Sequence, residues 1–180
     1  MSKIEDIRSA LPQAAKDTKL NLQRVLEAPS LNPRQRGVVA LACAYAIKHK
    51  ALIAAIEQWA DASITTGGED TSADNVKADA VAAASLMAMN NVFYRFKHLV
   101  GDAAYDKAPS GLRMNHIAKP LTDKLTFELA SIAVSAINGC GVCIESHNAS
   151  IKEHGGTSEH VLDSIRIAAV TCATATAMGA

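Results

Sequence analysis

Residues 128–147 read ELASIAVSAINGCGVCIESH, a segment that combines an alanine-rich helical pattern with two cysteines and a histidine. Apolar residues at helical spacing predict a helix over residues 127–137, and Asn138-Gly139 is typical of the end of a helix. A second helix is predicted from Cys140 to His154. We therefore expect two consecutive helices, with Cys140 at or near the first turn of the second one.

The helical pattern also covers most of the remaining chain. Amphipathic spacing near the amino terminus is broken at Pro12, and Pro33 is well placed to begin the next helix. The further predicted helices cover residues 34–59 with a break near 48–50, residues 72–94 and residues 159–177, and the predicted loops cover residues 65–68 and 101–120.

The composition favours helices over strands. Alanine is frequent, and aromatic residues make up only 4% of the chain. Alanine loses no side-chain entropy in a helix, whereas β-branched and aromatic residues suit pleated sheets. We therefore expect an all-α fold, and the 180 residues are enough for one helical domain, 1–180, that buries a sizeable core.

A weak internal similarity relates the two halves of the chain. Ala-Tyr-Ala-Ile at residues 44–47 resembles Val-Ser-Ala-Ile at residues 134–137. One interpretation is a duplicated helical unit, with halves roughly at 34–94 and 121–178. The alternative is a chance similarity between two alanine-rich helices.

The charges balance and exclude several classes of partner. Lys plus Arg number 18 and Asp plus Glu number 18, so no positive excess is present to neutralise nucleic-acid phosphates. No uninterrupted apolar run reaches the roughly 18 residues of a membrane-spanning helix, so we expect no membrane partner. The amino-terminal residues lack an apolar signal core, which predicts a cytoplasmic protein. The neutral balance does not oppose self-association, and we expect a homo-oligomer.

The C-x-x-C pair suggests thiol chemistry. Free backbone N–H groups near the start of a helix favour a thiolate, and Cys143 is close enough to Cys140 for a disulfide. His147 lies one turn beyond Cys143 and can hydrogen-bond to it directly or through water. Glu128, on the preceding helix, could orient His147 or accept its proton. A thiol, a base and an orienting group are thus expected in one small volume.

The pair has three other interpretations. A zinc site could use Cys140, Cys143, His147 and Glu128, as in a helical zinc-binding or scaffolding protein, although the chain has no second C-x-x-C. A thioredoxin-like motif should come with a βαβ pattern, which is not visible here. Two inert buried thiols would need no neighbouring histidine. The residues favour thiol redox chemistry and leave the zinc site open.

The other cysteines and one further histidine receive no role. Cys43 and Cys172 lie on alanine-rich helix faces, where a free cysteine is most often a small packed hydrophobe. His116 could approach the cysteines from the loop at 101–120, but the spacing does not require it.

The pattern Glu128-x11-Cys140-x2-Cys143-x3-His147 resembles the signature of the alkyl hydroperoxidase D (AhpD) family, within the carboxymuconolactone-decarboxylase-like superfamily. The segments that carry the resemblance extend over essentially the whole chain: Leu11-Pro12, Asp17-x2-Leu20-Asn-Leu22, 89–95, 111–115 and 127–140. The resemblance implies an all-α fold with a duplicated helical unit, assembled as a homotrimer.

The resemblance also implies the role of each site residue. Cys143 would attack the peroxide and become a sulfenic acid. Cys140 would supply a proton and then resolve the sulfenic acid as a disulfide with Cys143. Glu128 and His147 would form the proton relay that activates Cys143.

The activity implied by the resemblance is that of a cytoplasmic antioxidant enzyme that reduces organic hydroperoxides without a bound cofactor. Electrons would come from dihydrolipoamide on a lipoylated dehydrogenase-complex subunit, and the peroxiredoxin AhpC would be a partner that the enzyme regenerates. Some family members place a histidine between the cysteines, where this chain has Gly141 and Val142, so its own peroxidase activity is expected to be lower. A related superfamily enzyme acting on a lactone is a further alternative, but such members lack the cysteine pair.

Overall fold

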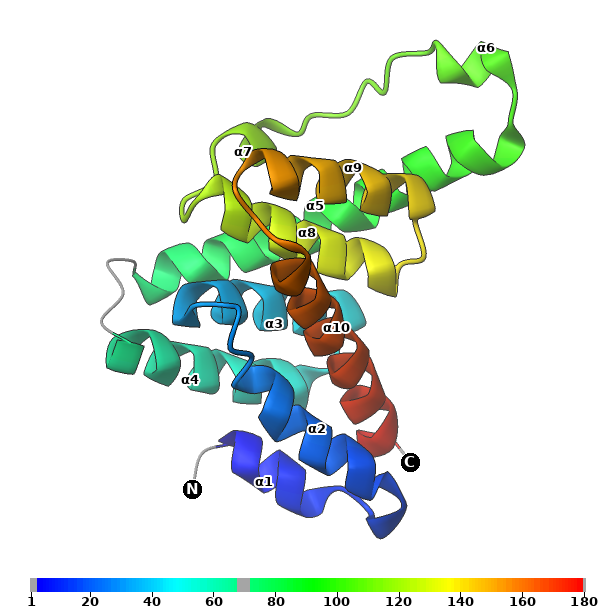
Figure 1. The fold of residues 1–180 in the computed structure, drawn as a ribbon. Coiled ribbons are helices and arrows are strands. Elements are labelled where there is room, and N and C mark those ends of the chain that lie inside the picture. The colour runs from blue at the N-terminus through cyan, green and yellow to red at the C-terminus, as the bar shows by residue number, and fades with distance from the viewer. Residues whose placement is uncertain (1–2, 68–71, 180) are drawn as a thin grey trace.

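The computed structural model describes residues 3–67 and 72–179 (Figure 1). Within these ranges every regular element is helical, which confirms the all-α prediction. The elements are α1 (Lys3–Ala10), the 3₁₀ turn η1 (Gln13–Ala15), α2 (Lys16–Leu26), α3 (Pro33–Ile47), α4 (Lys50–Gly67), α5 (Ala73–Val100), α6 (Ala103–Asp106), α7 (Asn115–Ala118), α8 (Lys124–Ile137), α9 (Gly141–Glu153) and α10 (Ser158–Met178).

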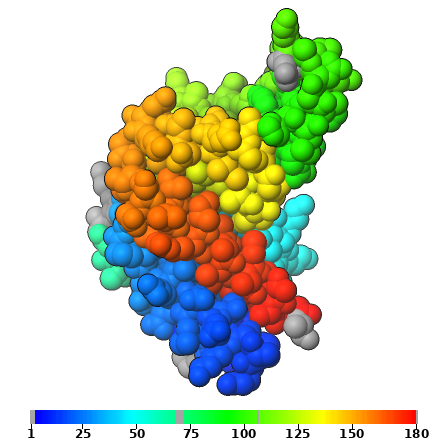
Figure 2. Space-filling view, turned by 45° about the vertical axis from the view of Figure 1, so that its right-hand side comes forward, coloured from blue at the N-terminus to red at the C-terminus, as the bar shows by residue number. Residues whose placement is uncertain are grey.

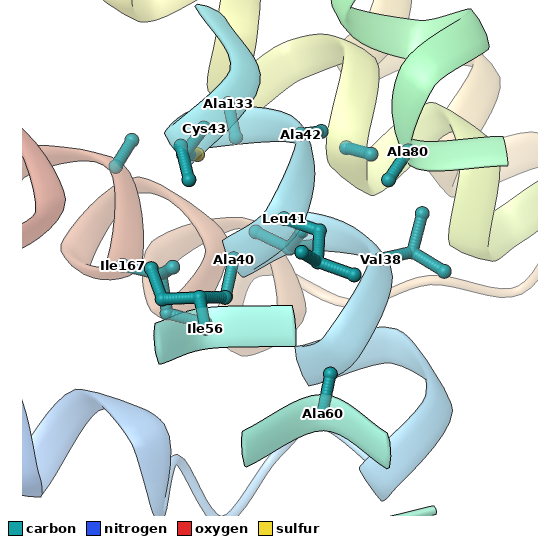
Figure 3. Close-up of a cluster of buried hydrophobic side chains, with 14 of the residues drawn as sticks. Val38, Ala40, Leu41, Ala42, Cys43, Ile56, Ala60, Ala80, Ala133 and Ile167 are labelled. Carbon is teal, nitrogen blue, oxygen red and sulfur yellow. The ribbon is translucent and has the colours of Figure 1, made fainter. Parts of the chain in front are cut away.

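Helix α3 lies at the centre of the bundle. Its residues 37–44 are all buried, and α4, α5, α8 and α10 pack around it. A helix that is apolar on every side must be covered on every side. Figure 3 shows this cluster, in which Leu41 and Cys43 of α3 lie among side chains such as Ile56 of α4 and Ile167 of α10. The small alanine side chains allow these helices to pack closely against one another.

The helix break predicted near residues 48–50 is confirmed. The loop predicted at residues 65–68 is wrong for residues 65–67, which are helical. Lys48 ends α3 in the left-handed conformation, with φ 64°, and α4 begins at Lys50. Helix α4 then continues to Gly67, and Gly68 lies outside the described residues. The Thr65 and Thr66 hydroxyls donate to carbonyls four residues earlier, so both threonines are accommodated within the helix.

Helix α5 continues beyond the predicted end at Tyr94. It reaches Val100, and its last turns project from the bundle together with α6 (Figures 1 and 2). Large apolar side chains on this projecting arm, among them Phe96 and Leu99, are exposed. The segment predicted to be turn-rich, residues 101–120, carries the two single-turn helices α6 and α7. Sequence periodicity missed the last turns because these apolar side chains do not face the core of this chain.

Helix α10 is long and apolar enough, by length and composition alone, to cross a membrane. Asp163 and Arg166 interrupt its apolar run, which is why no uninterrupted stretch was found in the sequence. Core helices of soluble proteins pass the same test. Here α10 packs against α2, α3 and α8, and Asp163 accepts a hydrogen bond from the Ser30 hydroxyl at 2.6 Å. Helix α10 is thus a packed member of the bundle and only weak evidence for a membrane span.

The order of helices is similar in the two halves of the chain. The sequence α3, α4, α5 is followed by α8, α9, α10, and α3 shifted by 90 residues nearly coincides with α8. The arrangement agrees with the proposed duplication of 34–94 in 121–178, which stays a prediction.

Candidate active site

The turn between α8 and α9 determines where the first cysteine lies. Gly139 has φ +67°, a left-handed conformation in which a side chain would be strained, so glycine is favoured there. The turn is tied to α5, because the Asn138 amide donates to Asn91 Oδ1 at 2.9 Å and the Arg95 guanidinium donates to the Asn138 carbonyl. The predicted end of the helix at Asn138-Gly139 is thereby confirmed, and Cys140 is held against the bundle.

The two cysteines are joined at the start of α9. Cys140 is the N-cap residue and Cys143 lies in the first turn, and the two form a disulfide with their Cα atoms 5.3 Å apart. The structure therefore represents the oxidised pair. Cys140 is fully buried, while Cys143 is 6% exposed. When the pair is reduced, the unpaired N–H groups and the dipole of α9 favour a thiolate in this turn.

Glu128 and His147 are in direct contact. Glu128 Oε2 lies 2.6 Å from His147 Nδ1, and Glu128 Oε1 lies 2.7 Å from Lys124 Nζ. Burial alone would raise the pKa of Glu128, but the hydrogen bonds from His147 and Lys124 outweigh it and hold this pKa below its ordinary value. The carboxylate is thus ionised, and each of its oxygens has a cationic or hydrogen-bonding neighbour.

The second ring nitrogen of His147 does not reach the cysteines. His147 Nε2 lies 3.1 Å from the Met87 sulfur, on α5. The direct hydrogen bond expected between His147 and Cys143 is therefore not formed in this oxidised state, since both ring nitrogens have other partners. The sulfur of Cys143 is bonded to Cys140, so it has neither an S–H group to donate a hydrogen bond to the ring nor a negative charge to accept one strongly.

Cys143, His147 and Glu128 all line one cavity of about 430 Å³. Asn90 and Tyr94 of α5 form another part of its wall, and Met114 and Ile117 come from the segment between α6 and α8. The complete lining is Asn90, Tyr94, Met114, Ile117, Glu128, Val142, Cys143, Ser146, His147 and Ser150. Cys143 therefore opens to the cavity, whereas Cys140 lies behind it.

Comparison with known proteins connects this arrangement to a family. The sequence model of the "Carboxymuconolactone decarboxylase family" matches residues 103–180. The chain is 46% identical over 178 residues to "Alkyl hydroperoxide reductase AhpD" of Anaeromyxobacter dehalogenans (strain 2CP-C), covering 99% of this chain and 91% of that protein. It is 47% identical over 170 residues to the protein of the same name from Coxiella burnetii (strain RSA 493 / Nine Mile phase I), covering 93% and 92%. The chain belongs to the AhpD family. The resemblance inferred from the sequence is confirmed.

The AhpD signature residues lie together, but they do not form a metal site in this structure. Within residues 3–67 and 72–179, no group of three or more His, Cys, Asp or Glu side chains is arranged to hold a metal ion. Both oxygens of Glu128 are engaged by His147 and Lys124. The zinc alternative therefore receives no support from the geometry.

The residues that the sequence left without a role are His116, Cys43 and Cys172. His116 Nε2 donates to the buried Asp79 carboxylate at 2.6 Å and does not contact the cysteines. Cys43 is fully buried in the core, and burial raises the pKa of its thiol far above the ordinary value. Cys172 is half-buried, and burial raises its pKa as well. Cys43 is packed in the core, as expected, whereas Cys172 keeps part of its surface exposed.

Several residues of the site were not identified from the sequence, among them Lys124, Asn90 and Tyr94. Lys124 lies one turn before Glu128 on the same helix, and this i, i+4 spacing could have predicted their ion pair from the sequence. Asn90 and Tyr94 lie on one face of α5, and the sequence places them only within the family segment 89–95. Met87, on the same face, is a fully buried core residue whose sulfur also contacts His147. Their contribution depends on how α5 packs against α9, which spacing does not reveal.

Proposed function

We propose that this chain is an alkyl hydroperoxide reductase in which Cys143 attacks the peroxide and Cys140 resolves the product. The observation that carries the proposal is the unequal access of the two sulfurs. Cys143 lines the cavity beside the Glu128–His147 pair, while Cys140 is fully buried behind it. The names of the AhpD relatives support an alkyl hydroperoxide as the substrate class.

The proposed reaction begins from the reduced pair. The Cys143 thiolate attacks the terminal oxygen of a hydroperoxide ROOH, the O–O bond breaks, and Cys143 becomes a sulfenic acid while RO⁻ leaves. The Cys140 thiol supplies the proton that converts RO⁻ to the alcohol. The Cys140 thiolate then attacks the Cys143 sulfur, forming the disulfide and releasing hydroxide, which is protonated to water. His147, held by Glu128, would remove the proton that makes the first thiolate, either through water or after its Nε2 atom turns from the Met87 sulfur towards the reduced Cys143.

The proposed electron donor is dihydrolipoamide on a lipoylated dehydrogenase-complex subunit. Its two thiols would reduce the Cys140–Cys143 disulfide and close into the lipoyl disulfide. The reduced pair would also reduce the disulfide of the peroxiredoxin AhpC, in the cytoplasm. Because Gly141 and Val142 stand between the cysteines, we propose that AhpC reduction outweighs the chain's own peroxidase activity. The exposed apolar arm with Phe96 and Leu99 supports assembly, for which we propose a trimer.

Thiol titration and metal analysis of the purified protein test the proposal together. The reduced protein should lose two thiols per chain on addition of cumene hydroperoxide, recover them with dihydrolipoamide, and contain no stoichiometric zinc. The thiols of Cys43 and Cys172 serve as an internal control, because these two thiols per chain should still be titrated after the peroxide is added. Stoichiometric zinc with no loss of thiols would instead support the helical zinc-binding protein.

A further inference from the structure

Asn90 is a buried polar residue of the cavity wall whose role is not explained by the fold. Its side chain is only 5% exposed, and it lines the cavity that also contains Cys143 and His147. Its amide oxygen, which is shielded from solvent, has no hydrogen-bond partner among the described residues. A buried carbonyl oxygen without a partner lowers stability, so most such groups in folded proteins are paired.

The neighbouring Asn91 has a structural role, because its side chain forms hydrogen bonds between helices. Its amide donates to Ser135 Oγ at 3.0 Å and its carbonyl accepts from Asn138 at 2.9 Å, so it links α5 to α8 and to the turn before Cys140. Among the residues that the structure describes, Asn90 makes no comparable bond between helices. Because Asn90 and Tyr94 are one turn apart and both line the cavity, the α5 backbone directs Asn90 to the cavity and away from Ser135.

We propose that Asn90 contacts the substrate: its amide group rotates on binding, so that the oxygen, which is shielded from water in the free protein, accepts a hydrogen bond from the O–H group of an organic hydroperoxide and directs the terminal oxygen towards Cys143. This inference rests on the proposed function. A hydroperoxide has a single donor hydrogen, on the oxygen that is transferred to sulfur. An acceptor held on the cavity wall therefore recognises the reacting end of the substrate.

The bond to Asn90 persists through the transfer. As the Cys143 sulfur bonds to the terminal oxygen and the O–O bond breaks, the hydrogen held by Asn90 stays on that oxygen and becomes the hydrogen of the sulfenic acid. The leaving RO⁻ takes its proton from Cys140, as proposed above, so no proton passes through Asn90. The same contact selects against dialkyl peroxides, which have no O–H group to donate.

The test is the Asn90→Leu variant, which keeps the approximate shape and removes the acceptor. The rate constant of reduced Cys143 with cumene hydroperoxide should fall about tenfold, the effect of one lost hydrogen bond to the reacting group. Alkylation of Cys143 by iodoacetamide, which needs no such acceptor, should stay within about twofold of wild type. The melting temperature should not fall, because an unpaired buried polar group is replaced by an apolar one.

Asn75→Leu is the matched control, since it makes the same change on α5 about four turns earlier and outside the cavity. It should leave all three measurements unchanged. Asn90→Ala provides a second variant if the leucine is not accommodated, and it should show the same selective loss.

Two results would overturn the inference. Reaction of Asn90→Leu and Asn90→Ala with the hydroperoxide at the wild-type rate would remove Asn90 from the substrate site. An equal loss of peroxide reaction, alkylation and melting temperature would make Asn90 a structural residue. A wild-type protein that does not react with cumene hydroperoxide would instead overturn the proposed function, so the two failures are distinguishable.

Discussion

Glu128 Oε2 lies 2.6 Å from His147 Nδ1, although the two residues belong to different helices. The contact forms because α8 and α9 meet at the turn of Gly139, which folds α9 back along α8. A carboxylate only accepts hydrogen bonds, so Nδ1 carries a hydrogen and the ring is oriented about that bond. The orientation of His147 is thus determined by Glu128, and that of Glu128 by Lys124.

The first prediction concerns this contact. Glu128→Gln keeps the shape of the side chain but removes the charge that holds His147. The rate constant of Cys143 with an organic hydroperoxide should fall by about 10²–10⁴, the usual worth of positioned proton transfer. Stopped-flow measurement on the reduced protein checks it, with Glu145→Gln, an exposed glutamate on α9, as the control. An unchanged rate would remove Glu128 from the mechanism.

The second prediction concerns Lys124, which donates both to Glu128 and to the Ile117 carbonyl at 2.8 Å. Lys124→Met removes a hydrogen bond and a positive charge that hold the pKa of Glu128 low, so this pKa should rise. The acidic limb of the pH–rate profile for Cys143 should then move to higher pH. Lys152→Met, on the exposed side of α9, should leave the profile in place. Coincident profiles for the Lys124→Met variant and wild type would contradict the positioning role.

The cysteine-to-histidine part of the site could be read from the sequence because it lies on one helix. Cys140, Cys143 and His147 follow one another at helical spacing, so a correct helix was enough to place Cys143 and His147 on the same cavity. The position of Glu128 needed the turn at Gly139, which Asn-Gly indicated. The contribution of Asn90 and Tyr94 of α5 to the cavity wall could not be predicted from the sequence, because it depends on packing between helices far apart in the chain.

The sequence predicted most of the helices but missed the ends of two of them. Alanine-rich periodicity predicted the buried helices, because their apolar faces repeat at helical spacing. It missed residues 65–67, where threonine hydroxyls bond within the helix, and the last turns of α5, whose Phe96 and Leu99 are exposed. Periodicity identifies a helix through the face that it buries, and these segments bury little within the chain.

The third prediction concerns the buried Asp79. Burial alone would raise its pKa, but hydrogen bonds from the Thr122 hydroxyl, the Leu121 N–H and His116 outweigh it and lower this pKa. A lowered folded pKa contributes stability above the unfolded value of roughly 3.9, and this contribution is lost as the pH falls through the folded pKa. Asp79→Asn should therefore reduce the free energy of unfolding at pH 7 by about 1–3 kcal/mol and by less near pH 3.

Urea unfolding at the two pH values measures this difference. Asp74→Asn, at the exposed start of α5, should have little effect at either pH. An equal loss of stability for Asp79→Asn at pH 7 and pH 3 would show that the charge of the carboxylate does not matter.

The last prediction concerns the division of labour between the cysteines. Cys143 opens to the cavity and Cys140 is fully buried, so only Cys143 is placed to meet a peroxide. Cys143→Ser should abolish peroxide consumption, because serine at neutral pH is a far weaker nucleophile. In Cys140→Ser, Cys143 still reacts once but has no resolving partner, so a sulfenic acid should accumulate on Cys143 and then oxidise further. Mass spectrometry after dimedone labelling locates it. Dimedone on Cys140 in Cys143→Ser, with none on Cys143 in Cys140→Ser, would reverse the assignment.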